Sequence, residues 1–338
     1  MTATGTGATI FGCSGPVLTA DERAFYRDAD PFGFILFARN VETPDQLLRL
    51  TSDLRDAVGR DAPVLVDQEG GRVQRLRAPH WREWLPPLEQ VAASGMQAAR
   101  GMALRSRIIA HELRAVGIDA NCAPCADLAT GSTHPFLRNR CYGTDPAQVA
   151  DVARAVADAH LAGGVLPVPK HMPGHGRSIA DTHHDLPTVT TDPATLDTTD
   201  FAPFRALAHL PLAMTAHVVF AALDPDRPAT QSPAMIDVIR NRIGFKGLLM
   251  TDDLNMQALS GTLADRAARA IAAGCDIALH CKGDMAEMQA VAAAAGRMGD
   301  ATLARAAAAL ACRRAPDPVD IAALEADLAR VLQGSAHV

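Results

Sequence analysis

The sequence has few aromatic side chains and no strong excess of charge of either sign. Of its 338 residues, 4% are aromatic and 21% are charged, and the formal net charge is −6. A nucleic-acid-binding protein usually carries a basic stripe, so this charge balance speaks against a nucleic-acid partner. Nearly half of the residues, 48%, are hydrophobic, which is enough for a sizeable core and argues against disorder.

Long hydrophobic runs are also missing. Residues 1–10 contain no basic segment followed by an apolar one, so we expect no signal peptide. No stretch of about 18 residues is apolar and uncharged, so we expect no membrane span. The seven cysteines are an odd number and lie scattered in apolar surroundings. This pattern favours reduced thiols in the cytoplasm over a disulfide framework.

Short apolar runs alternate with longer segments of helical periodicity. The runs that we expect to be strands cover residues 8–12, 33–37, 63–67, 118–122, 165–170, 212–217, 247–251 and 276–280. The segments that we expect to be helices include residues 43–58, 96–116, 146–162, 192–207 and 264–273. Several of these begin with a capping residue followed by proline and end at glycine, as helices commonly do.

This alternation predicts an α/β fold with a parallel sheet. Eight strand–helix units favour a single closed (β/α)8 barrel of the TIM type over an open doubly wound sheet, which is the main alternative. We expect one catalytic domain over residues 1–338. Its Ala-rich tail, from about residue 300 to 338 and broken at Pro316-Asp-Pro318, is predicted to form peripheral closing helices.

Ionisable residues follow five of the predicted strands at the point where each strand ends. These residues are Asp67, Lys170 with His171, His217, Asp252 with Asp253, and His280. Barrel enzymes carry their active sites at the carboxyl ends of the strands. Charged groups next to buried strands need partners or a function. The pattern therefore predicts an active site at this end of the barrel, without naming the reaction.

The segment from Lys170 to Asp185 is a loop that contains a candidate proton-transfer pair. Asp181 and His183 are two residues apart, so their side chains can meet, and a carboxylate on one imidazole nitrogen raises the basicity of the other. Glycines at the start of the loop permit movement. The alternatives are a surface loop with incidental histidines, or a metal site.

A metal site could draw its ligands from this loop. The candidate ligands are His171, His175, His183, His184 and Asp185. Their spacing matches no compact zinc pattern, so we expect no metal. Cys122-Ala-Pro-Cys125 has the spacing of a redox motif, but it lacks two further ligands at matching spacing, and we interpret these cysteines as core thiols.

Two adjacent carboxylates, Asp252 and Asp253, end the seventh predicted strand. Neighbouring side chains there point in different directions, so one can face the barrel mouth. A carboxylate in that position is a suitable nucleophile towards an anomeric carbon. One of the two can instead cap a helix, and the pattern leaves the two nearly equivalent. Asp67 with Arg72, Arg75, Arg140 and Lys170 would suit a polyhydroxylated ligand.

Four motifs together resemble family 3 glycoside hydrolases, in particular the bacterial β-N-acetylhexosaminidases of the NagZ type, which act in peptidoglycan recycling. The motifs are Asp67-Gln-Glu-Gly-Gly-Arg-Val-Gln-Arg75, Lys170-His-Met-Pro-Gly-His-Gly with Asp181-Thr-His183, Met214-Thr-Ala-His217 and Thr251-Asp-Asp-Leu-Asn-Met256. The resemblance extends from about residue 8 to about residue 285. Asn139-Arg-Cys-Tyr-Gly143 resembles a fifth stretch of the family and carries Arg140.

The resemblance implies a retaining exo-β-N-acetylglucosaminidase that needs no cofactor. Asp252 would be the nucleophile, and His183 paired with Asp181 would be the general acid/base. The sugar site would consist of Asp67, Arg75, Arg140, Lys170 and His171. The substrate would be a muropeptide, GlcNAc linked to anhydro-MurNAc, and we expect a monomer or weak dimer.

The sequence departs from the family at Met172, Arg177 and Asn139, none of which is a proposed catalytic residue. Arg177 bears on the loop from Gly174 to His183 and on the preferred leaving group. Three rival functions stay open. They are a family 3 β-glycosidase with another sugar specificity, a metal-dependent barrel hydrolase, and a sugar-binding barrel without catalysis.

Overall fold

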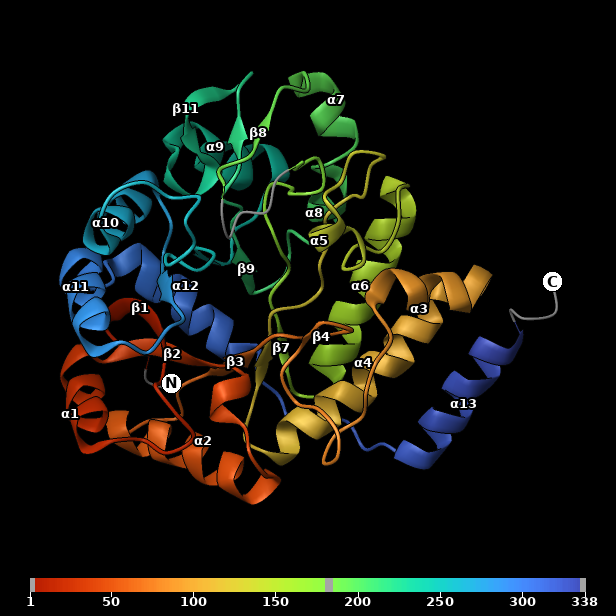
Figure 1. Ribbon diagram of the computed structural model, residues 1–338, viewed down its shortest axis with the longest axis horizontal. Coiled ribbons are helices and arrows are strands. Elements are labelled where there is room, and N and C mark those ends of the chain that lie inside the picture. Colours follow the sequence, from red (N-terminus) through yellow and green to blue (C-terminus); the bar gives the residue numbers. More distant parts are fainter. Residues whose placement is uncertain (1–3, 180–184, 335–338) are drawn as a thin grey trace.

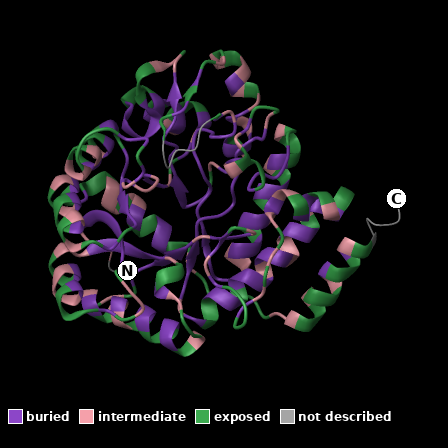
Figure 2. Ribbon diagram, viewed as in Figure 1, coloured by how far each residue is buried: buried purple, intermediate pink, exposed green. Residues whose placement is uncertain are grey.

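The computed structural model describes residues 4–179 and 185–334. Each of the eight predicted strand runs overlaps a strand, and six of these strands are shorter than expected. In chain order they are β1 (Gly7–Gly12), β2 (Pro31–Leu36), β3 (Val64–Val66), β6 (Ala120–Asn121), β7 (Leu166–Pro167), β9 (Leu212–Met214), β12 (Leu248–Met250) and β13 (Ala278–His280). All of their residues are buried, as expected for strands that are covered on both faces (Figure 2).

These strands pair in parallel, most of them with the next strand of the set in chain order, and β13 pairs with β1. Six of them form one sheet in the order β13-β1-β2-β3-β6-β7, and β9 pairs with β12 in a second sheet. The amide of Met214 donates to the carbonyl of Pro169 at 3.0 Å, and an isolated parallel bridge joins Met250 to Ile277. The α/β class with a parallel sheet is therefore confirmed. Since the strands form two ladders, a single closed barrel stays a prediction.

The long helices lie outside the strands (Figure 1). They are α1 (Ala20–Ala29), α2 (Pro44–Val58), α4 (Ala98–Ala115), α6 (Pro146–Ala162), α10 (Leu263–Ala273), α11 (Met285–Ala295) and α12 (Asp300–Ala311). The caps are those that the sequence predicts. For example, Thr43 accepts a hydrogen bond from the amide of Gln46 ahead of α2, and Gly59 ends that helix in the left-handed conformation.

The prediction of one helix over residues 192–207 is wrong. The segment forms two short helices, α7 (Pro193–Thr198) and α8 (Ala202–Ala206). Pro203 lies in the first turn of α8, where its missing N–H is tolerated, but it could not continue a helix that began at Pro193. Between the two helices, the buried carboxylate of Asp200 accepts from Nε of Arg177, in the loop after β7, at 2.7 Å.

Two small sheets at the carboxyl ends of the strands were not predicted. The hairpin of β4 (Gln68–Gly70) and β5 (Val73–Gln74) follows β3, and a three-stranded sheet contains β8 (Thr188–Val189), β10 (Val219–Phe220) and β11 (Asp224–Pro228). Their strands are too short or too polar to show a period in the sequence. In the hairpin, Gly70 has a φ of +108° and a Cβ there would collide with Arg105, so this turn requires glycine.

The C-terminal tail forms α12 and, after the predicted break, α13 (Ile321–Gly334). α12 contacts β12, whereas α13 packs against α4 and α3 (Pro87–Ser94) at the outer side of the molecule (Figure 1). α12 therefore lies against a strand and α13 against other helices, and their role as closing helices stays a prediction. No helix within residues 4–179 and 185–334 is long and apolar enough to cross a membrane.

Candidate active site

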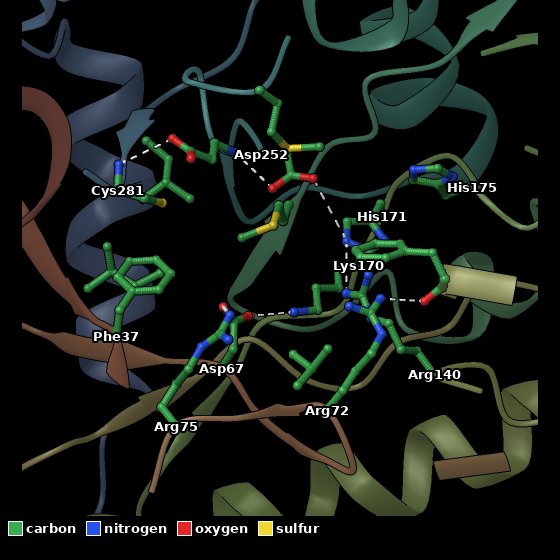
Figure 3. A pocket seen from close by; sticks show the side chains of 17 residues that line it. Phe37, Asp67, Arg72, Arg75, Arg140, Lys170, His171, His175, Asp252 and Cys281 are labelled. Atoms are coloured by element: carbon green, nitrogen blue, oxygen red, sulfur yellow. Dashed lines mark hydrogen bonds and ion pairs between the residues drawn. The ribbon is translucent and has the colours of Figure 1, made fainter. Parts of the chain in front are cut away.

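A cavity of about 200 Å³ lies where the parallel strands end (Figure 3). Most of its walls come from residues that follow β2, β3, β6, β7, β12 and β13. The cavity is lined by Ile35, Phe37, Asp67, Arg72, Val73, Arg75, Phe136, Arg140, Lys170, His171, His175, Met214, Asp252, Asp253, Met256, Leu279 and Cys281. The structure thus brings together Asp252 and all five residues that the sequence assigned to a sugar site.

Asp67 holds two cations at one wall of this cavity. Its Oδ1 lies 2.6 Å from Nζ of Lys170, and its Oδ2 lies 2.9 Å from Nη2 of Arg75. Burial alone would raise the pKa of Asp67, but Lys170 and Arg75 outweigh it and hold this pKa well below its usual range. Asp67 is therefore ionised across the physiological range, and its oxygens are fixed in place beside the cavity.

Glu69 is a member of the site that the sequence reasoning missed. It is buried in β4, and its Oε1 and Oε2 accept from Nη2 and Nε of Arg140 at 2.8 and 2.9 Å. Its Oε1 also lies 2.6 Å from Nζ of Lys170. Burial raises the pKa of Glu69, yet Arg140 and Lys170 lower it to about 2. Glu69 lies within the Asp67–Arg75 motif, which was the one available signal. No local pattern showed that its side chain would contact Arg140 and Lys170.

Asp127 is a second missed residue, and it connects several groups behind the cavity wall. It is fully buried, and its Oδ2 lies 2.7 Å from Nδ1 of His171. Its Oδ1 accepts from the amide of His175 at 2.7 Å. Burial raises the pKa of Asp127, but His171 outweighs it and keeps this pKa far below its usual range. Asp127 therefore fixes the ring of His171, whose Nε2 lies 3.9 Å from Oδ2 of Asp252.

Cys125, Asp127 and His171 are also a set with possible metal-ligand atoms within 4.8 Å of one another. The thiol of Cys125 donates to Asp127 at 3.3 Å, so hydrogen bonds that converge on Asp127 account for the geometry of this set. The predicted alternative, a metal site on the loop after β7, involves His183 and His184, which lie outside the described residues.

The two adjacent carboxylates at the end of β12 have different surroundings. Oδ1 of Asp252 accepts from the amide of Asp253 at 2.8 Å. Burial raises the pKa of Asp252, but His171 and His217 outweigh it and lower this pKa. Burial raises the pKa of Asp253 to about 6, although its Oδ1 accepts from the amides of Asn255 and Cys281 at 3.1 and 3.2 Å. Asp252 is thus the more acidic group. Asp253 connects the loop after β12 to the loop after β13.

The remaining strand-end histidines lie behind the walls of the cavity. Nδ1 of His217 lies 2.7 Å from Oγ1 of Thr230, and its Nε2 lies 3.1 Å from the carbonyl of Asp253. Burial lowers the pKa of His217, although the charge of Asp252 opposes this effect. Nε2 of His280 lies 3.1 Å from Glu287. Of the strand-end ionisable residues, these two histidines do not line the cavity.

The predicted acid/base pair, Asp181 and His183, lies outside the described residues. Of the three family departures, Arg177 bonds Asp200 at 2.7 Å and Thr199 at 3.1 Å. Met172 is buried in the core. Asn139 ends α5 (Pro135–Arg138), and its carbonyl accepts from the amide of Leu88 at 3.1 Å. None of the three lines the cavity.

Comparisons with known proteins find similar sequences over most of the chain. The profile of the glycosyl hydrolase family 3 N-terminal domain matches residues 20–312. A β-hexosaminidase of Methylococcus capsulatus is 38% identical over 281 residues, which cover 80% of this chain and 82% of that protein. A second β-hexosaminidase, of Xylella fastidiosa, is 37% identical over 297 residues, covering 85% of this chain and 87% of the relative.

Solved structures of a family member are similar to this chain over nearly its whole length. NagZ from Neisseria gonorrhoeae superposes with a TM-score of 0.83 at 28% identity, and the match covers 100% of both chains. The same enzyme in complex with N-trifluoroacetyl-D-glucosamine also has a TM-score of 0.83 at 28% identity, covering 99% of both chains. Together with the cavity, these likenesses show that the chain belongs to glycosyl hydrolase family 3, as a hexosaminidase of the bacterial NagZ type.

Proposed function

We propose that this glycoside hydrolase is a retaining exo-β-N-acetylglucosaminidase of peptidoglycan recycling. It would remove terminal β-linked GlcNAc from cytoplasmic muropeptides, in which GlcNAc is linked to anhydro-MurNAc. The observation that carries the proposal is the position of Asp252, an acidic carboxylate at the cavity wall, 3.9 Å from Nε2 of His171. The carboxylate of Asp67 offers hydrogen-bond acceptors, and Lys170 and its neighbouring arginines offer donors, as binding of a sugar requires.

The terminal sugar would be held by fixed groups. Asp67 accepts from hydroxyl groups, while Lys170, Arg75 and Arg140 donate to ring substituents, and His171 lies between these residues and Asp252. Asp67 and Glu69 already hold these cations in place. The cationic side chains therefore lose little conformational entropy when the substrate binds.

The reaction would proceed in two displacements. An oxygen of Asp252 attacks the anomeric carbon as the glycosidic bond breaks, and His183 gives its proton to the leaving oxygen. Water then attacks the same carbon, its proton returns to His183, and the ester bond to Asp252 breaks. Asp181 would orient His183, and an imidazole that titrates near neutral pH suits both roles. The anomeric configuration is retained.

We also propose that residues 1–338 form one (β/α)8 barrel domain with a peripheral helical tail from about residue 300. The order of the eight parallel strands and the contacts between β7 and β9 and between β12 and β13 support this fold. The cytoplasmic location is supported by the seven free cysteines, six of which are buried. The partner would be a carbohydrate, and the protein a monomer or weak dimer.

Labelling with a fluorinated N-acetylglucosaminide, followed by peptide mapping, tests the reaction directly. We expect the label on Asp252, which would establish the covalent intermediate and therefore retention. Asp252→Ala should lose activity towards an aryl β-GlcNAc by at least about a thousandfold, with an unchanged thermal unfolding curve. Near-normal turnover by this variant would exclude Asp252 as the nucleophile.

The substrate part of the proposal needs its own measurement. We expect purified enzyme to release GlcNAc from GlcNAc-anhydro-MurNAc with a higher kcat/KM than from N,N′-diacetylchitobiose, and to leave an aryl β-glucoside nearly untouched. Equal kcat/KM values on the two disaccharides would indicate a general β-N-acetylglucosaminidase and not an enzyme that prefers muropeptides. A preference for the glucoside would assign the chain another sugar.

A further inference from the structure

Arg105 is a buried cation that the proposed reaction does not use. It lies on α4, does not line the cavity, and is only 1% exposed. Burial lowers its pKa to about 10, so it is a cation at neutral pH. Among residues 4–179 and 185–334, no carboxylate forms an ion pair with it. A buried charge without an opposite charge costs stability unless hydrogen bonds compensate for it, so the contacts of Arg105 indicate its role.

Both terminal nitrogens of Arg105 donate to backbone carbonyls in and after the β4–β5 hairpin. Nη2 donates to the carbonyl of Glu69 in β4. Nη1 donates to the carbonyl of Leu85, in the segment after the hairpin, at 2.9 Å. Cζ of Arg105 also lies 5.5 Å from the centroid of the Trp84 ring, and the carbonyl of Trp84 accepts from the amide of Gly71 at 2.9 Å. Arg105 therefore connects the hairpin to the segment that follows it.

The guanidinium of Arg105 packs directly against the backbone of the hairpin. A Cβ on Gly70 would lie 1.7 Å from Nη2 of Arg105 and 2.8 Å from its Cζ. Interiors packed this closely leave little room for either partner to move alone. Loss of the guanidinium would therefore remove both a hydrogen bond and a packing contact from the backbone at Glu69 and Gly70.

Glu69 connects Arg105 to the proposed sugar site. Its carbonyl accepts from Arg105, whereas its Oε1 lies 2.6 Å from Nζ of Lys170 and 2.8 Å from Nη2 of Arg140. Lys170 and Arg140 both line the cavity. A displacement of about 1 Å caused by a change far from the chemistry can cost about a hundredfold in rate. The backbone position of Glu69 therefore matters to both cations.

We propose that Arg105 is a positioning residue of the sugar site. It fixes the backbone of Glu69, and through the Glu69 carboxylate it determines where Lys170 and Arg140 present their donors to the sugar. This inference rests on the proposed function, because it takes Lys170 and Arg140 as sugar-binding residues. It extends the support of the site to α4, a helix that does not line the cavity.

The kinetics of Arg105→Met on an aryl β-GlcNAc test this role. Methionine retains much of the apolar volume but cannot donate to either carbonyl. Sugar-binding groups contact the substrate both before and during the reaction, so their displacement raises KM more than it lowers kcat. We expect KM to rise about tenfold while kcat falls by less than about threefold. Arg105→Lys should raise KM less, because lysine keeps the charge but lacks the planar fork that reaches two carbonyls.

A merely structural role of Arg105 predicts a different result. A partly unfolded variant contains fewer active molecules, so its apparent kcat falls while KM stays at the wild-type value. An unchanged KM in Arg105→Met and Arg105→Lys therefore overturns the inference, whatever happens to kcat. If Arg105→Met does not fold, as judged by circular dichroism, the KM of Arg105→Lys decides the matter.

Arg107→Met is the matched control. Arg107 is another arginine of α4 that donates to a backbone carbonyl, that of Asp317, at 2.9 Å, but its partner lies in the C-terminal tail. We expect this variant to keep the wild-type KM. A rise in KM equal to that of Arg105→Met would contradict a role that depends on the hairpin.

Arg140→Met separates the failure of this inference from the failure of the proposed function. It removes a proposed sugar-binding group itself, so it should raise KM whether or not Arg105 positions the site. If Arg140→Met raises KM and the Arg105 variants do not, only this inference is wrong. If the wild-type enzyme does not cleave the aryl β-GlcNAc, or Arg140→Met keeps the wild-type KM, the proposed sugar site is wrong and the inference fails with it.

Discussion

Asp252 and Asp253 differ in what their carboxylates face, although they are neighbours in the chain. Asp252 lies near His171 and His217, and these rings lower its pKa against the effect of burial. Asp253 faces backbone amides and the charge of Asp252, and its pKa rises to about 6, chiefly through burial. A nucleophile has to be ionised at neutral pH, so the surroundings of Asp252 suit that role and those of Asp253 suit a structural one.

The raised pKa of Asp253 predicts a pH-dependent stability. A carboxyl group with a higher pKa in the folded state stabilises the fold at low pH, and this contribution is lost as the pH rises through about 6. Asp253→Asn keeps an acceptor for the amides but cannot ionise. We expect the variant to be about 1–2 kcal/mol more stable relative to wild type at pH 8 than at pH 5, allowing for partial screening by solvent.

Urea unfolding of both proteins at the two pH values measures this difference. The wild-type curve at each pH is the control for all other titrating groups. If the difference in free energy of unfolding between variant and wild type is the same at pH 5 and pH 8, Asp253 does not titrate in this range.

Asp127 acts through His171, whose Nδ1 it binds at 2.7 Å. Asp127→Asn retains the size of the side chain but removes its charge and replaces one of its two accepting oxygens by an amide NH2 group. We predict that kcat/KM falls about 10–100-fold, as expected for the loss of a charge-assisted hydrogen bond, and that the pH–rate profile shifts. Cys125→Ala, which removes a weak thiol donor to the same carboxylate, should change the profile little. A variant with lower stability and an unchanged pH profile would indicate a purely structural role.

At the scale of elements, the β4–β5 hairpin is the unit that assembles the sugar site. It follows β3 directly, and its turn brings Arg75 back to Asp67 at 2.9 Å. Its first strand presents Glu69 to Arg140 and Lys170, which come from loops far away in the chain. The hairpin therefore couples the end of one parallel strand to the residues that follow two others.

Removing the charge of Glu69 should cost stability as well as activity. Glu69→Gln leaves Arg140 and Lys170 buried with one carboxylate fewer, and breaking a buried ion pair in this way costs about 3–5 kcal/mol. Glu83→Gln is the control, because Glu83 pairs with Arg77 at 2.7 Å on the surface and should cost less than about 1 kcal/mol. Chemical denaturation distinguishes the two, and equal losses would mean that the buried network contributes no more than a surface pair.

At the scale of the whole molecule, α13 is set apart from the strands and the cavity. It covers α3 and α4 at the periphery (Figure 1), and it buries Leu328 and Val331. The family match ends at residue 312, before this helix begins. α13 therefore contributes to stability by covering apolar surface, at a distance from the proposed chemistry.

A chain shortened to residue 319 tests this division. We expect the melting temperature to fall by about 5 °C, from the lost burial of apolar side chains, while kcat/KM for an aryl β-GlcNAc stays within about twofold of wild type. Leu328→Ala in the full chain should lower the melting temperature by less. A large loss of turnover in the shortened but folded protein would show that α13 supports the active site.

Local patterns in the sequence were sufficient to predict the positions of the eight strands, most of the long helices and the residues that follow each strand. This works because strand and helix periodicity, caps and glycine stops are properties of neighbouring residues. The same patterns predicted one helix over residues 192–207, where Pro203 allows only two short ones. They also missed the small sheets, whose strands are too short to show a period.

The contacts that distinguish one carboxylate from another depend on residues far apart in the chain. Glu69 meets Lys170 across 101 positions and Asp127 meets His171 across 44, so no local pattern could reveal either pair. The sequence alone determined that ionisable groups gather at the strand ends and, through its motifs, the family. Only the folded chain determined which of those groups line the cavity, which hold the others in place, and how Asp252 differs from Asp253, because burial and charge are set by neighbours in space.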